Sequence, residues 1–175
     1  MTKEVIIKEL SQRHINFVNY ILSLSYKEFM FSFQDNWTAG QQMDHIYRAT
    51  VFLPLAFQMP EFIIGFIFGK PKNAPMGYDE LVQQYLLQLE KGARAPHLFK
   101  PAKIPYSYRI DLADKTVKNI SKINIAIDAI PEKHLDQLML PHPLLGKITY
   151  REMLYFTMYH VNHHSAIAKR YVSEM

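Results

Sequence analysis

The sequence contains no cysteine, and this absence excludes several kinds of site. Structural disulfides, thiolate metal sites and a cysteine nucleophile are all ruled out. A chain of 175 residues can bury about 70% of the surface that its unfolded form exposes, so it folds without a disulfide or zinc staple. A bound metal is therefore expected to act in chemistry, and any thiol chemistry must use a thiol from the substrate.

A long uninterrupted apolar run is also missing. Residues 51–69 approach membrane-spanning length, but Pro54, Gln58, Pro60 and Glu61 interrupt them. We interpret this stretch as core or as a subunit interface, and we expect no membrane association. The first ten residues are charged and too short in their apolar part for a secretory signal, and no Arg-rich transit segment follows. A cytoplasmic location is expected.

An excess of positive charge is confined to one segment. From residue 91 to residue 122 there are eight Lys/Arg and two Asp/Glu, whereas the rest of the chain is nearly balanced. Lys91, Arg94, Lys100 and Lys103 lie close together and can receive the carboxylates or phosphate of a small molecule. A solvated loop is the alternative. No nucleic-acid partner is expected, because neither a recognition helix nor a basic-aromatic platform is present.

Apolar residues recur at helical spacing and strand alternation is absent, which predicts a single all-α domain over residues 1–175. Inward positions of the first helix include Ile15, Val18 and Ile21. Capping boxes at Thr38–Gln41 and Thr149–Glu152 predict two helix starts, and Pro54 should bend the second helix. Helices are predicted at residues 11–33, 39–57, 78–90, 111–130 and 150–172, with a short apolar segment at 61–68 and long loops at 91–108 and 131–148.

Two histidines stand one turn apart on the last predicted helix. His160 and His164 are at positions i and i+4, so their imidazoles can point at one spot. The same face carries Met153, Phe156 and Ile167, which indicates that it is buried. Buried imidazoles need partners, and a divalent metal would satisfy both at once. Ordinary hydrogen bonds to neighbouring hydroxyls or carbonyls are the alternative.

The best candidate for a third ligand is His45, which lies midway along the second predicted helix on an apolar stripe. Its neighbours Asp44 and Arg48 are spaced i, i+4 and are expected to pair at the surface. Glu152 is expected to be occupied in its cap. No second inward carboxylate is therefore evident as a general base.

The remaining histidines are weaker candidates. His163 is rotated about 100° from His164, so it is expected either in the second shell of the site or at the surface. His142, between two prolines, can overhang the site and face a substrate. Structural roles are expected for His14, His97 and His134, which lie in polar contexts or loops.

Three motifs together resemble a known superfamily. They are W-T-x-x-x-x-x-D-H at Trp37–His45, H-P-L-L-G at His142–Gly146 and E-M-L-x-F-x-x-x-H-x-x-H-H at Glu152–His164. The chain is similar to the DinB-like and YfiT-like metalloenzymes, which include bacillithiol- and mycothiol-dependent transferases. This resemblance implies a four-helix bundle with an additional short helix and long loops, often dimeric. It also implies a divalent ion, zinc or nickel, held by His45, His160 and His164.

Three imidazole ligands leave a position open on the ion, as in catalytic sites. A small thiol bound there would be favoured as its thiolate, which predicts a thiol-dependent S-transferase. Water bound there would favour hydrolysis instead. The sequence does not choose between these small-molecule reactions. The alternative is a metal-binding or stress-related dimeric bundle without catalysis.

Overall fold

The computed structural model describes all residues from 1 to 175, and most of them are helical. The all-α prediction is therefore confirmed at the level of fold class, with one small hairpin as the exception. Short 3-10 turns lie at 33–35, 97–99, 106–108 and 132–136. The helices are α1 (Lys3–Ser23), α2 (Tyr26–Met30), α3 (Ala39–Thr50), α4 (Leu53–Gln58), α5 (Glu61–Phe68), α6 (Tyr78–Glu90), α7 (Arg109–Asp128) and α8 (Tyr150–Ser173).

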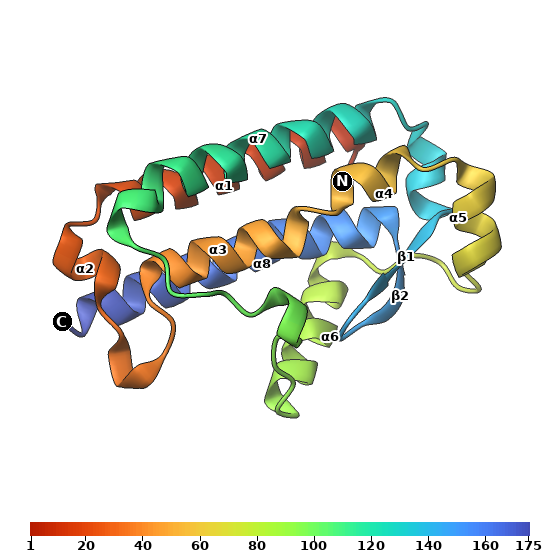
Figure 1. Cartoon of the computed structure of the whole chain (residues 1–175). Helices are drawn as coiled ribbons and strands as arrows, with labels where there is room; N and C mark the ends of the chain where they lie inside the picture. Colours follow the sequence, from red (N-terminus) through yellow and green to blue (C-terminus); the bar gives the residue numbers. More distant parts are fainter.

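Four long helices pack along one another and form the body of the molecule. α1 contacts α7 and α8, and α3 contacts the same two helices. Figure 1 shows α1 and α7 as one layer, with α3 and α8 side by side beneath it. α4 and α5 lie toward one end of this body, and α6 packs against α8. This arrangement places the middle of α3 against the middle of α8.

The start of α3 and the start of α8 are fixed by the two predicted capping boxes. The Thr38 hydroxyl accepts the Gln41 amide at 3.3 Å, and the Gln41 side chain accepts the Thr38 amide at 3.1 Å. Thr149 and Glu152 make the same reciprocal bonds at the start of α8. Because a shift of one residue rotates a side chain by about 100°, these caps help to fix which residues face each other.

The first helix differs from its predicted bounds. α1 begins at Lys3 and ends at Ser23, and a further capping box at Ser25 and Glu28 opens the separate α2. Ile15, expected inward, is 41% exposed, whereas Val18 and Ile21 are buried. The predicted helix at 11–33 is therefore wrong in its bounds, because the chain turns at Leu24 and Ser25 caps a separate helix.

The second predicted helix is broken and not merely bent. α3 ends at Thr50 and α4 begins at Leu53, which places Pro54 in the first turn of the new helix. A proline there loses no hydrogen bond, since the first amides of a helix have no intrahelical acceptor. The break redirects α4 so that Leu53 and Phe57 remain buried.

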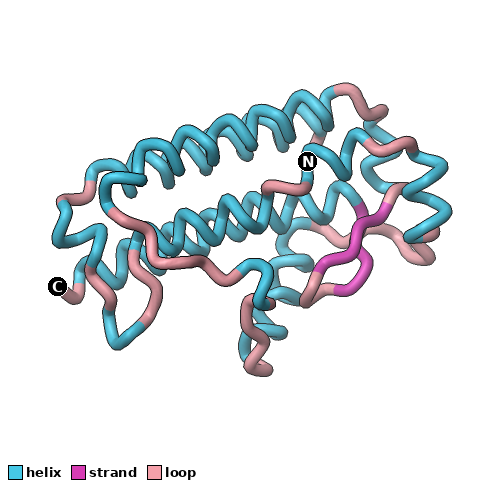
Figure 2. The backbone as a smooth tube through the Cα atoms, viewed as in Figure 1, coloured by secondary structure: helices cyan, strands magenta, loops and turns pink.

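The predicted loop at 131–148 contains an antiparallel hairpin, which is a correction to the expectation of no strands. β1 (Met139–His142) pairs with β2 (Gly146–Thr149), with Met139 opposite Thr149 and His142 opposite Gly146. Figure 2 shows this hairpin just before α8. Its register follows from burial, since Leu140 and Ile148 are paired and both lie in the core. The hairpin holds His142 at a fixed place ahead of α8.

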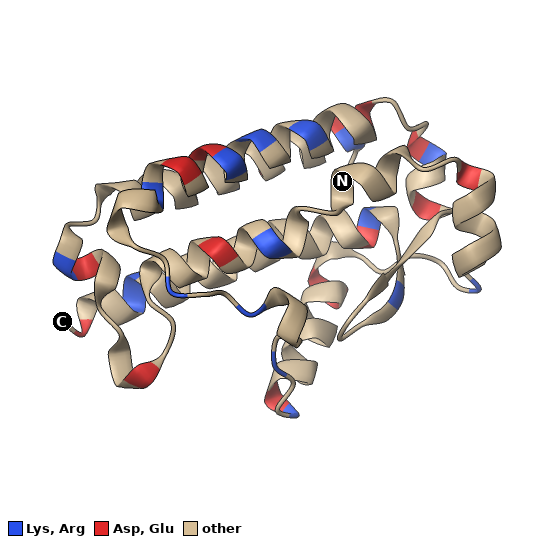
Figure 3. Cartoon of the chain, viewed as in Figure 1, with Lys and Arg blue, Asp and Glu red and all other residues tan.

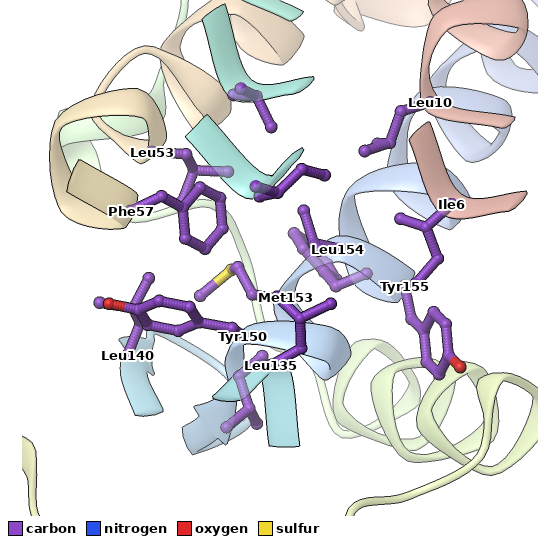
Figure 4. Packing of buried hydrophobic residues seen from close by; sticks show 14 of the residues in the cluster. Ile6, Leu10, Leu53, Phe57, Leu135, Leu140, Tyr150, Met153, Leu154 and Tyr155 are labelled. Atoms are coloured by element: carbon purple, nitrogen blue, oxygen red, sulfur yellow. The ribbon is translucent and has the colours of Figure 1, made fainter. Parts of the chain in front are cut away.

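A large apolar cluster surrounds the first half of α8. Leu53 and Phe57 of α4 meet Tyr150 and Met153 there, as Figure 4 shows, and the Phe57 and Tyr150 rings lie 4.8 Å apart.

No single helix is both long and apolar enough to cross a membrane. The segment Ala39–Gln58, which contains α3 and α4, reaches the length and composition of a membrane span only together with Glu61–Phe68, and the two are bent by 117° at the break between them.

Candidate metal centre

Three histidines from two helices meet in the interior. His45 comes from the middle of α3, and His160 and His164 come from successive turns of α8. All three are buried, with at most 6% of each residue exposed. α3 and α8 run in opposite directions, since Phe33 lies beside Tyr171 and Phe57 beside Tyr150. That alignment brings His45 opposite the pair on α8.

The Nε2 atoms converge on one point. His45 Nε2 lies 3.2 Å from His160 Nε2, and His160 Nε2 lies 3.0 Å from His164 Nε2. One ligand atom from each residue falls within 4.8 Å of the other two, so the group is close enough to hold a metal ion. The structure thus brings together the residues that the sequence indicated as a set.

Hydrogen bonds fix the orientation of two of the rings. His45 Nδ1 donates to the Phe99 carbonyl at 2.7 Å, and His164 Nδ1 donates to the side-chain oxygen of Gln42. A neutral imidazole carries one hydrogen, so Nε2 of both rings presents a lone pair. Such a partner on the second nitrogen is the usual support of a metal-ligating histidine.

Hydrogen bonding alone leaves this group incomplete. His160 Nε2 carries at most one hydrogen when the ring is neutral, yet it faces the lone pairs of both His45 and His164. A divalent ion would accept all three lone pairs. Two nitrogens each about 2.1 Å from one ion, at about 90° to 109°, lie about 3.0 to 3.4 Å apart, which matches the two close separations. The residues therefore fit a divalent metal.

The electrostatics of the group keep the rings neutral. Burial lowers the pKa of His160 and of His164 well below the usual value, and the neighbouring imidazoles lower it further. Burial also lowers the pKa of His45, more than its bond to Phe99 raises it. Neutral rings keep their lone pairs available to an ion near pH 7.

No carboxylate belongs to this group. Asp44 is paired with Arg48 at 2.6 Å, as predicted, although the Asp44 side chain is buried and not at the surface. Glu152 accepts the Thr149 amide in its cap and also the Met76 amide at 2.8 Å. Both carboxylates are thus occupied elsewhere, as the sequence indicated.

A cavity of about 850 Å³ opens beside the three histidines. This volume is in the range of small-molecule sites. Of the four predicted cationic residues, Arg94 and Lys100 line it, whereas Lys91 and Lys103 do not. Figure 3 shows only cationic residues in the segment between α6 and α7 that carries them, against both signs along α7.

His142 lines the same cavity from the hairpin. Its Nδ1 accepts the backbone amides of Leu144 at 3.2 Å and Leu145 at 3.1 Å, so the single hydrogen of the neutral ring lies on Nε2. Burial lowers the pKa of His142 to about 4. The ring packs edge-on against Phe156, with 4.2 Å between centroids. The predicted overhanging position is consistent with this placement.

His163 is half-buried, lines the cavity and stacks on Tyr159. It is outside the three-histidine group, as its rotation on the helix indicated. Burial lowers its pKa. Among the histidines expected to be structural, His14 is fully buried and not in a polar context, and His134 bonds Glu61 at 2.6 Å.

Sequence reasoning missed three groups around the centre. Gln42 lies about one turn before His45, and this spacing could have suggested its role. Trp37 packs on both helices' ligands, with its ring centroid 5.0 Å from that of His45 and 6.3 Å from that of His164. The Phe99 carbonyl left no signal, because any residue type supplies the same backbone oxygen.

Neither a family model, nor a curated protein, nor a solved structure matches this chain. The resemblance to the DinB-like superfamily therefore stays a prediction based on the three sequence motifs.

Proposed function

We propose that this chain is a metal-dependent enzyme of the DinB-like four-helix-bundle type, with His45, His160 and His164 as the ligands of one divalent ion. The observation that carries the proposal is the convergence of three neutral, buried Nε2 atoms, two of them oriented by hydrogen bonds on Nδ1. The adjoining cavity supports an enzyme, since a structural ion needs no room for a guest molecule.

Zinc or nickel is the proposed ion, because imidazole suits both metals and the motif resemblance implies them. When bound, such an ion supplies a Lewis acid that favours the deprotonated form of a thiol or of water. The side chains of this chain bind and orient the reactants beside it. Arg94 and Lys100 offer positive charge to an anionic reactant, and His142 Nε2 offers a hydrogen.

The reaction class we favour is transfer of a low-molecular-weight thiol to an electrophile. The chain has no thiol of its own, so the nucleophile would be a co-substrate. Hydrolysis at the same site is the variant of this proposal. Neither reaction can use Asp44 or Glu152 as a free base, because each is already bonded.

A non-catalytic metal-binding bundle is the second candidate. The observation that favours it is the lack of any carboxylate in the three-histidine group to act as a general base. In that case the ion would stabilise the fold or its assembly.

We further propose a homodimer, as the resemblance implies. The apolar residues Phe62 and Phe66 of α5 are 77% and 91% exposed, and Leu55 of α4 is also exposed. Burying them against a second copy would remove this apolar surface from water. The 51–69 stretch would then serve both as core, through Ile64 and Phe57, and as interface.

Metal analysis of the purified protein, followed by assays of bacillithiol, glutathione and coenzyme A with a reference electrophile, tests the function. We expect about one ion per chain and thiol-dependent turnover. His160→Ala should lose both, whereas His97→Ala, at an exposed histidine, should keep both. Bound metal without turnover across thiol and ester panels would favour the second candidate, and absence of metal would refute both.

A further inference from the structure

One part of the cavity is lined almost entirely by apolar side chains and lies on the α4 side of the three histidines. We name it the apolar arm and define it by six residues: Leu53, Ala56, Met59, Leu140, Leu144 and Met153. They come from α4 and its C-cap Met59, from the hairpin and its turn, and from the first turn of α8. The contact between Phe57 and Tyr150 holds α4 against the first turn of α8 and so fixes this side of the arm.

The arm extends away from the histidines along α8. Met153 precedes His160 by about two turns, which is about 10 Å of helix. Ala49 and Phe156, one turn from His45 and His160, also line the cavity and join the arm to the centre. The cavity is therefore elongated, with the three Nε2 atoms beside its middle and the arm at one end.

Charge is distributed unevenly along this cavity. Its charged lining residues are Asp35, Arg94 and Lys100, and none of them comes from α4, the hairpin or α8. Lys100 follows Phe99, whose carbonyl bonds His45, so its backbone lies at the histidine centre. Among the lining residues of α4, the hairpin and the first turn of α8, the one polar residue is His142, which is neutral: its Nδ1 is occupied by two backbone amides and its Nε2 carries one hydrogen. A charged group in the arm would lose its hydration without gaining a charged partner, and His142 Nε2 could return only one neutral hydrogen bond.

We propose that the arm binds a linear hydrocarbon chain of the substrate, so that the substrate class is an amphiphilic small molecule with an anionic or metal-binding head. The head lies at the histidines, near Arg94 and Lys100, and the chain extends toward Met59 and Leu144. The position of the head rests on the proposed metal function, whereas the position of the chain rests on the arm alone.

Calorimetric binding of butanoate, hexanoate, octanoate and decanoate to the full-length protein tests this inference, with and without added zinc. Each added methylene that enters the arm should tighten binding by about two- to fourfold. The gain should stop once the arm is filled. A dissociation constant that stays the same along the series would overturn the proposal.

Variants at neighbouring positions of α4 locate the chain. Ala56→Phe fills the arm and should remove the gain for octanoate and decanoate while leaving butanoate binding within about twofold. Gln58→Phe is the matched control, because Gln58 lies on the same helix, is exposed and does not line the cavity. Equal chain-length dependence in both variants would refute the assignment. If Ala56→Phe does not fold, Leu144→Asp in the hairpin turn should abolish the same gain.

The measurements with and without zinc separate this inference from the proposed function. If zinc does not bind but the chain-length gain persists and is lost in Ala56→Phe, the metal function fails and the arm stands. Zinc binding with no chain-length gain would have the opposite meaning.

Discussion

Gln42 and His164 are joined across α3 and α8 by a hydrogen bond from the imidazole Nδ1 to the amide oxygen. Gln42 is buried, and its own amide nitrogen donates to the Trp37 carbonyl at 3.4 Å. One side chain thus orients a ligand on the opposite helix and ties it to the segment before α3. This bond gives the first prediction.

Gln42→Leu should weaken metal affinity by about 10- to 100-fold, because the variant removes the acceptor that orients His164. Gln42→Glu keeps an oxygen at the same place and should retain most of the affinity. Competition with a chromogenic chelator measures both. Equal affinity in the Leu variant and the parent protein would show that this bond does not support the site.

His142 should contribute to stability through its turn and to activity through its Nε2 hydrogen. His142→Ala leaves the Leu144 and Leu145 amides without their acceptor and should lower the free energy of unfolding by about 1–3 kcal/mol in urea. His142→Asn can accept the same amides and should recover part of that loss.

The same Asn variant separates the two roles. It should keep its metal but lower kcat/KM by about tenfold, which corresponds to one lost hydrogen bond. Unchanged kcat/KM in His142→Asn would restrict His142 to its structural role.

His14 should make stability depend on pH. Burial lowers its pKa to about 4 from 6.5, and its Nε2 has no hydrogen-bond partner. Between these values the unfolded chain takes up a proton that the folded chain does not, so stability is complete above pH 6.5 and falls as the pH falls toward 4. This residue alone should contribute a slope of up to about 1.4 kcal/mol per pH unit.

Urea unfolding of His14→Leu in chelator, across that pH range, checks the sign. The free energy of unfolding of the variant should fall less steeply with decreasing pH than that of the parent protein. The difference in slope should correspond to about one proton taken up on unfolding. His97→Leu serves as the exposed control. A parallel decline in the His14 variant would mean that its ring is protonated in the folded state.

The proposed homodimer predicts a change in size on mutation of α5. Phe66→Glu puts a charge at a 91% exposed apolar position and should convert the dimer to monomer without loss of helical content. Light scattering coupled to gel filtration measures the mass, and circular dichroism the helicity. Lys72→Glu, on the nearby loop, is the control for added negative charge. A monomeric parent protein would contradict the dimer.

Local signals account for the parts of the fold and the site that the sequence predicted. The caps at Thr38 and Thr149 begin two helices whose middles carry the three histidines, and helical geometry alone puts His160 and His164 on one face. The start of the separate α2 could also have been predicted, since Ser25 and Glu28 have capping-box spacing. There the apolar periodicity continues through the turn and hides it.

Other features depend on distant partners. The hairpin forms because Leu140 and Ile148 enter a core built mainly by α4 and α8, which no local pattern reveals. The acceptor for His45 is a backbone oxygen 54 residues away. Ile15 has the same local spacing as its buried neighbours and differs only in what packs against it.

The separation of the ligands along the chain links the ion to the completion of folding. His160 and His164 are neighbours in any helical segment, but His45 is 115 residues from His160. Bringing such distant residues together in an unfolded chain costs about 4 to 5 kcal/mol of chain entropy. An unfolded or half-folded chain would therefore lack the His45 ligand, and full affinity would appear only once α3 and α8 have docked.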